Sequence, residues 1–166
     1  NWASHLLKRN PITPAILEKI EPPLRREPLT RQRFFWNTML NHQSMNCIYS
    51  GEALSPDAFS LDHFLPWSYV CHDQLWNLIP ANRSANSSKG KSLPDTEQLE
   101  AFIIEHHRAL NISRRVFGEG KWLSVTESYV DGLGIPVSSL LDLNKLQEAY
   151  RNRMNPLIAL ASQLGY

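Results

Sequence analysis

The chain has 166 residues, of which 42% are apolar and 20% are charged, and its formal net charge at pH 7 is +1. This length suits one compact domain, and the composition is that of a globular protein, so wholesale disorder is excluded. The small net charge neither requires nor excludes a polyanionic partner, because the local distribution of charge matters more than the total.

Basic residues gather in two stretches of the sequence. Residues 1–40 contain seven Lys and Arg against three Glu, and residues 81–91 contain Arg83, Lys89 and Lys91 with no acidic residue. Taken alone, such clusters are typical of a solvated face.

The two cysteines, Cys47 and Cys71, are too few for a disulfide framework and do not form a CxxC pair, which favours a reducing, cytoplasmic location. No apolar run reaches the roughly 20 residues of a membrane span, and no signal-peptide pattern opens the chain, so we expect no membrane partner. The chain begins at Asn1 rather than Met, so we expect it to be a piece of a longer protein.

The first segment, residues 1–44, is predicted to be a helical, proline-rich arm. Its prolines allow only short helices, such as one over residues 14–20. We expect Thr30 to cap a longer helix that ends near His42. The apolar face of that helix consists of Phe34, Phe35, Trp36, Met39 and Leu40.

The central segment, residues 45–95, changes pattern. Residues 47–49 and 59–61 are short strand candidates, and Ser50-Gly51-Glu52 is a turn, so the sequence predicts a β-hairpin here.

The last segment, residues 96–166, is predicted to be a helical subdomain. Asp95 and Gln98 form a capping box before a helix whose apolar face carries Leu99, Phe102, Ile103, His106 and Leu110. A modest helix follows over residues 121–130, and another begins at Ser138 or Ser139. Pro156 is expected to interrupt the tail before a final buried helix with Leu157, Ile158, Ala161 and Leu164. The predicted fold class is α+β: a small αβ centre embedded in flanking helices, all forming one compact unit.

Three runs carry the chemistry: SLDHFLPWS at residues 60–68, WNLIP at 76–80 and SANSSKGK at 84–91. Together they resemble the HNH endonucleases, whose pattern is a strand ending in Asp-His, a loop, an Asn-Leu pair and a helix bearing Asn or His followed by Lys. Asn77 and Asn86 lie 14 and 23 residues after His63. This spacing is similar to that of the HNH domain of RNA-guided CRISPR effectors. The resemblance covers about residues 45–95 and implies a ββα-metal core.

The residue types fit phosphodiester hydrolysis. His63 has an ordinary pKa near neutrality and can accept a proton from water as the general base. Asp62 and Asn86 offer hard oxygen ligands, which suit Mg²⁺, with Mn²⁺ also possible. Adjacent strand residues point to opposite faces, so both can serve one site only if the strand ends there, and Pro66 favours such an end.

Further residues of the motif receive supporting roles. The resemblance implies that Asn77 tethers the loop after His63 and so orients the base. Lys89 shares a helix face with Asn86 and is expected to bind a phosphate oxygen, as are Arg83 and Lys91. His72 is left out of the site because its loop is expected to lie at the surface, and His106 is expected to be a core histidine.

Many HNH domains carry two CxxC pairs that bind a structural zinc, and this sequence departs from that pattern. The equivalent positions hold Cys-Ile-Tyr-Ser at 47–50 and Asn-Arg-Ser-Ala at 82–85, so we expect no structural Zn²⁺. Packing of Trp67, Tyr69 and Trp76 is expected to hold the fold instead.

The leading hypothesis is a metal-dependent endonuclease that cuts single- or double-stranded DNA, as the cleavage module of a larger defence protein (CRISPR or restriction-like) or mobile-element protein, with other domains or subunits as partners. One alternative is a catalytically silent HNH-fold module for nucleic-acid binding or assembly. Another is a ribonuclease or toxin nuclease that uses the same residues. In the simplest structural reading, Asp62, Asn77 and Asn86 merely cap turns and helices while His63 packs in the core.

Overall fold

The computed structural model describes residues 28–166, and the predicted helix over residues 14–20 lies outside them. The described elements, in chain order, are α3 (Thr30–His42), β1 (Ser60–His63), α4 (Trp67–Val70), η1 (Leu75–Asn77), β2 (Leu78–Ala81), α5 (Arg83–Lys89), α6 (Thr96–Val116), α7 (Glu119–Leu133), η2 (Val137–Ser139) and α8 (Leu143–Gln163). Helices dominate around one small sheet, which confirms the predicted α+β class.

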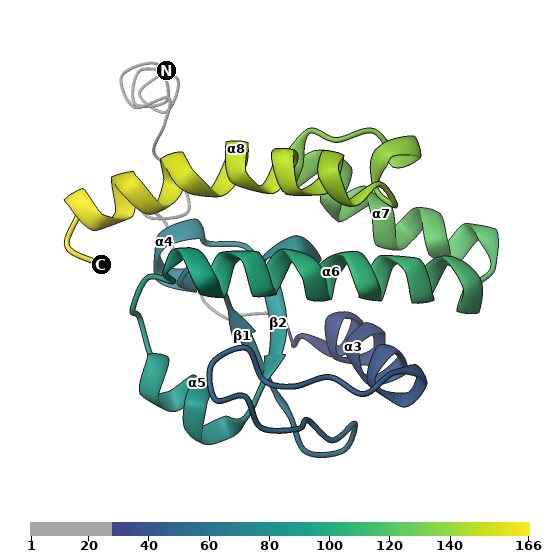
Figure 1. Cartoon of the computed structure of the whole chain (residues 1–166), viewed down its shortest axis with the longest axis horizontal. Helices are drawn as coiled ribbons and strands as arrows, with labels where there is room; N and C mark the ends of the chain where they lie inside the picture. Colours follow the sequence, from purple (N-terminus) through teal and green to yellow (C-terminus); the bar gives the residue numbers. More distant parts are fainter. Residues whose placement is uncertain (1–27) are drawn as a thin grey trace.

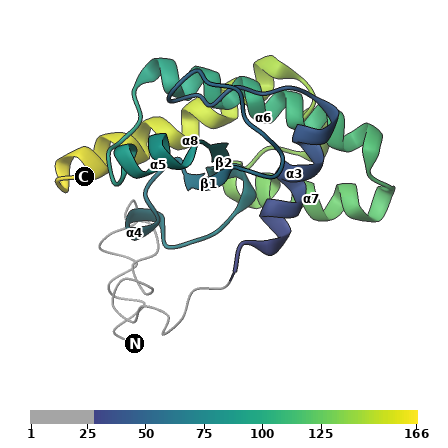
Figure 2. The same cartoon turned by 90° about the horizontal axis from the view of Figure 1, so that it is seen from below.

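The sheet is an antiparallel pair, β1 with β2, whose register runs from Ser60 opposite Ala81 to His63 opposite Leu78. It lies near the centre of the molecule, between α5 on one side and α3 on the other (Figures 1 and 2). Strand β2 is buried at all four positions.

The predicted hairpin between residues 47–49 and 59–61 is wrong in its pairing. Residues 48–50 form a turn, and the nearby pairing in the described part of the chain is an isolated bridge between Asn46 and Ala53. The partner of β1 is the later segment Leu78–Ala81. Pro80 is compatible with that strand because a two-stranded sheet leaves one edge of each strand unpaired, where the missing N–H is not needed.

The capping prediction at α6 is confirmed. The Asp95 carboxylate accepts from the Gln98 N–H at 2.8 Å, and the Gln98 side chain accepts from the Asp95 N–H at 3.1 Å. The predicted apolar face of α6 is buried, His106 included. This helix packs against α8 and α3, which brings residues far apart in sequence into one core (Figure 1).

Other helix ends differ from the predictions. Leu29, not Thr30, occupies the cap position of α3, and Phe34 is 51% exposed rather than buried. The helix expected from Ser138 or Ser139 begins later, because the Asp142 carboxylate accepts from the N–H groups of residues 144 and 145.

Pro156 does not interrupt the last helix. Helix α8 runs through it without a break to Gln163, and Leu164 is 55% exposed. The proline ring is on an exposed face, and the buried contacts of Met154, Leu157 and Ala161 hold the helix together on either side of it. Tertiary packing thus outweighs the helix-breaking tendency of proline.

Three helices fix the segment that follows β1. Phe64 stacks on Phe102 of α6 with ring centroids 4.0 Å apart. Gly132 of α7 lies directly against the Trp76 indole, with no room for a side chain. From α8, the Tyr150 hydroxyl donates to the Trp76 carbonyl at 3.0 Å, and beyond it Tyr166 donates to the Ser68 carbonyl at 2.9 Å.

Within residues 28–166, no helix combines the length and apolar character that a bilayer span requires.

Candidate active site

Strand β1 carries Asp62 and His63 as adjacent residues at its carboxyl end. The strand ends at His63, as the following Phe64-Leu65-Pro66 run predicts. Asp62 is 5% exposed, and the His63 side chain is 11% exposed. Each residue meets a different set of partners.

Asp62 forms a buried cluster with Tyr49 and Lys89. The Tyr49 hydroxyl donates to Asp62 Oδ2 at 2.6 Å, and Lys89 Nζ lies 3.1 Å from the same oxygen. Burial raises the pKa of Asp62, while the Lys89 charge and the Tyr49 hydrogen bond act in the opposite direction. Burial, followed by the charge of Asp62, also raises the pKa of Tyr49, so its hydroxyl keeps its proton and remains a donor.

Asn86 approaches the Asp62 side of β1 from α5. Its Nδ2 donates to Ser60 Oγ at 3.1 Å, and the Ser60 hydroxyl donates to the Ala81 carbonyl of β2 at 3.1 Å. Ser60 and Asp62 are two residues apart on a strand and therefore share a face. Because the amide nitrogen of Asn86 faces Ser60, its amide oxygen points away from Ser60. The structure thus brings Asp62 and Asn86 to the same side of the strand.

Lys89, three residues after Asn86 on α5, has its ammonium inside the cluster rather than on the surface. Besides Asp62, Nζ donates to the His63 carbonyl at 3.0 Å, and the side chain is 7% exposed. Arg83, the first residue of α5, and Lys91, two residues after its last, are by contrast exposed. The three basic residues that the sequence grouped as phosphate contacts are thus in two different environments.

A hollow of about 500 Å³ opens beside α5. Tyr49 and Lys89, the two partners of Asp62, line it together with Ser84 and Ser88.

His63 faces a residue that the sequence did not single out. Its Nε2 lies 2.7 Å from Asp73 Oδ1, in the segment between α4 and η1. Both side chains are largely shielded, with 11% exposure for His63 and 22% for Asp73.

The neighbouring His72 is partly buried rather than on a fully exposed loop. Its ring lies 5.2 Å from the Trp76 ring, and its Nδ1 accepts from the Gln74 N–H at 3.3 Å. Burial, and next the nearby charge of His63, lowers the pKa of His72 to about 4. His72 is therefore neutral at physiological pH and helps to order the segment that carries Asp73.

Asn77 is completely buried and holds the loop that follows His63. Its Oδ1 accepts from the Leu65 N–H at 2.9 Å, and its Nδ2 donates to the Leu65 carbonyl at 3.0 Å. In addition, the Phe64 N–H donates to the Asn77 carbonyl at 2.9 Å. The side chain and backbone of one residue thus fix the turn by which the chain leaves β1.

Sequence reasoning missed Tyr49 and Asp73. Tyr49 precedes Asp62 by 13 residues and was assigned to a strand, and Asp73 follows His63 by 10 residues in an irregular segment. Neither helical nor strand periodicity links residues at such separations, so the contacts depend on the fold of the whole segment. His106, in contrast, is the core histidine that was expected, with Nδ1 2.8 Å from the Tyr129 hydroxyl.

Residues 47–95, which span Tyr49, β1, β2 and α5, match the family model described as HNH endonuclease. Neither curated proteins nor solved structures gave a match to the chain. The matched segment contains the Asp-His strand end, the loop-tethering Asn77 and the Asn86-bearing helix in the order of the ββα-metal core. Residues 47–95 of this chain are therefore a domain of the HNH endonuclease family.

Proposed function

We propose that the chain hydrolyses phosphodiester bonds in DNA as a divalent-metal-dependent endonuclease. The observation that carries the proposal is the arrangement at the end of β1. His63 has a carboxylate partner, and the adjacent Asp62 shares a strand face with Ser60, to which the Asn86 amide donates.

His63 acts as the general base. A ring nitrogen of the neutral imidazole takes a proton from a water molecule, and the resulting hydroxide attacks the phosphorus in line with the leaving 3′ oxygen. Hydrogen-bonded support of the base is common at such sites because it fixes the reactive nitrogen in one direction. The Asn77 contacts to Leu65 supply part of that support by holding the loop directly after His63.

The donor set of Asp62 and Asn86 fits Mg²⁺ or Mn²⁺. Within residues 28–166, no group of three or more His, Cys, Asp or Glu could hold a metal. Asp62 and Asn86 instead offer one carboxylate and one amide oxygen, a hard and sparse set that suits a cation which keeps several waters. Such a cation, when bound, neutralises charge on the scissile phosphate and at the leaving oxygen. Tyr49 and Lys89 orient the Asp62 carboxylate for this task.

The exposed bases of the α5 region, Arg83 and Lys91, are proposed to contact the DNA backbone. Lys89 is proposed to reach a phosphate oxygen from its position at Asp62, next to the hollow beside α5. The choice of DNA, and a role as the cleavage module of a larger defence or mobile-element protein, rest on the spacing of His63, Asn77 and Asn86. A cytoplasmic, reducing setting completes the proposal.

Plasmid cleavage tests the function. We expect the chain to nick or linearise supercoiled plasmid with Mg²⁺ or Mn²⁺ and to stop when EDTA is added. The variant His63→Ala should lose cleavage while its circular dichroism spectrum stays unchanged. His42→Ala, which removes an exposed histidine at the end of α3, is the matched control and should cut like the wild type.

Two results would overturn the proposal. Undiminished cleavage by His63→Ala would exclude this residue as the base. Absence of cleavage on plasmid, single-stranded DNA and RNA, combined with retained binding, would favour the catalytically silent binding module. Cleavage of RNA alone would identify a ribonuclease that uses the same site.

A further inference from the structure

We propose that Asp73 is a positioning residue that fixes the ring of His63 and directs Nδ1 toward the attacking water. This inference rests on the proposed function, since it assigns the partner that orients the general base. Asp73 lies inside the HNH segment, but its role follows from its contacts and not from the motif.

The hydrogen bond itself determines which nitrogen carries the proton. A carboxylate accepts hydrogen bonds and donates none, so the 2.7 Å contact from Asp73 Oδ1 requires the proton on His63 Nε2. In the neutral ring the lone pair then lies on Nδ1. Nδ1 is therefore the atom that takes the water proton, and the ring becomes a cation whose charge the Asp73 carboxylate stabilises.

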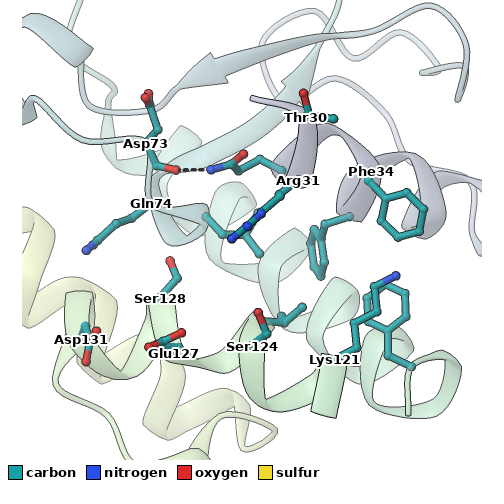
Figure 3. A pocket seen from close by; sticks show the side chains of 15 residues that line it. Thr30, Arg31, Phe34, Asp73, Gln74, Lys121, Ser124, Glu127, Ser128 and Asp131 are labelled. Atoms are coloured by element: carbon teal, nitrogen blue, oxygen red, sulfur yellow. Dashed lines mark hydrogen bonds between the residues drawn. The ribbon is translucent and has the colours of Figure 1, made fainter. Parts of the chain in front are cut away.

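Asp73 is held in place from helix α3, outside the HNH segment. Gln32 Nε2 donates to the Asp73 carbonyl at 2.8 Å, a hydrogen bond drawn as a dashed line in Figure 3. The bond forms at the edge of a hollow of about 740 Å³ between α3 and α7. Figure 3 shows the Asp73 carboxylate pointing away from this hollow, which leaves it for His63.

The rest of the segment is ordered by its own contacts. Cys71 adopts a left-handed conformation, with φ of 54°, and ends α4. The Gln74 N–H donates to His72 Nδ1, and the Trp76 indole N–H donates to the Gln74 side-chain oxygen. Because Trp76 is fully buried, the segment that carries Asp73 is anchored to the core rather than to solvent.

A purely structural ion pair is the competing explanation of the contact. In that case the contact contributes only to stability, and removing it should leave the chemistry untouched. A positioning role predicts instead a loss in kcat with little change in KM, because the contact matters in the transition state rather than in DNA binding.

The first experiment is cleavage kinetics of the full chain on a plasmid or duplex oligonucleotide. We expect Asp73→Asn to lower kcat by about 100-fold, the scale of a misdirected general base, with KM within about threefold of the wild type. Asp73→Glu, which keeps a carboxylate, should regain part of that loss. Asp131→Asn is the matched control: it removes an exposed carboxylate among the residues that line the same hollow and should cut like the wild type.

The second experiment is ¹⁵N NMR of the His63 ring, which needs no activity. At a pH where the ring is neutral, we expect the wild type to show the proton on Nε2. In Asp73→Asn, whose amide can also donate, we expect both tautomers.

The outcomes separate the two proposals. If the wild type cuts, His63→Ala does not, and Asp73→Asn retains kcat within about threefold, the positioning role of Asp73 is wrong while the nuclease proposal stands. A wild-type ring protonated on Nδ1 would also exclude it. If the wild type does not cut but its ring carries the proton on Nε2 in an Asp73-dependent way, the orientation is supported and the nuclease proposal fails.

Discussion

Replacement of Asn77 by Ala should destabilise the protein strongly, although it removes only one small polar side chain. Asn77 and Leu65 are both 0% exposed, and the two side-chain hydrogen bonds of Asn77 go to the N–H and carbonyl of Leu65. The variant leaves both backbone groups buried without these partners. At about 1–3 kcal/mol for each of the two unsatisfied groups, the expected loss in the free energy of unfolding is about 2–6 kcal/mol.

Urea unfolding, followed by tryptophan fluorescence, measures this loss from the midpoint and slope of the transition. Asn41→Ala is the matched control, because the Asn41 amide bonds to Asn37 on the exposed face of α3. Its cost should stay below about 0.5 kcal/mol. Asn77→Asp should cost at least as much as Asn77→Ala near pH 7, since it places a carboxylate oxygen against the Leu65 carbonyl. If Asn77→Ala cost no more than Asn41→Ala, the two hydrogen bonds would not hold the loop.

Three further predictions concern stability and use the same unfolding measurement. Gly132→Ala should cost about 1–3 kcal/mol, because the added methyl group would collide with the Trp76 indole. Gly120→Ala in the same helix has open space around it and should be neutral or stabilising. Equal effects of the two substitutions would contradict the close approach of Gly132 to Trp76. Burial lowers the pKa of His106 to about 3 from an ordinary 6.5, so the unfolded chain takes up a proton that the folded chain refuses. The stability from this group is complete above pH 6.5 and is lost as the pH falls toward 3. His106→Asn should therefore remove up to about 1.4 kcal/mol per pH unit from the acid slope between pH 6 and 4, and an unchanged slope would refute the assignment. Pro156→Ala should stabilise the chain by about 1–3 kcal/mol, because alanine supplies the backbone N–H that proline lacks inside the continuous helix α8. A loss of stability would show that the proline ring makes a needed contact.

The parts of the fold that the sequence predicted are those governed by local rules. The capping box of Asp95 and Gln98 acts over three residues, and the buried face of α6 follows from helical periodicity. The spacing of His63, Asn77 and Asn86 could also be used to predict the candidate site, because it matches a strand, a loop and a helix of defined length. These features identify which segments are helices or strands and which residues belong to the candidate site.

The errors arise where distant packing outweighs local preference. Pro80 argues against a strand, yet the segment pairs with β1 because the sheet has only two strands in the described part of the chain. Pro156 argues against a continuous helix, yet buried residues on both sides of it hold α8 together.

The candidate site predicted from the sequence was incomplete for the same reason. The sequence predicts that Lys89 and Asn86 share a helix face. It does not predict that the Lys89 ammonium reaches Asp62 and the His63 carbonyl. The contact between His63 and Asp73 depends on a segment ordered by Gln32 from another helix, which no local pattern encodes.

Two tyrosines, one in α8 and one after it, limit how the HNH domain can be transferred to another protein. Tyr150 and Tyr166 donate to carbonyls 74 and 98 residues earlier, at Trp76 and Ser68. During translation, the segment between β1 and β2 emerges long before these donors exist, so a product that stops before α8 has the catalytic motif without its support. For the same reason, a fragment limited to residues 47–95 would leave the carbonyls of Ser68 and Trp76 without these hydrogen-bond donors in any fusion protein. A functional graft has to include α8 through Tyr166.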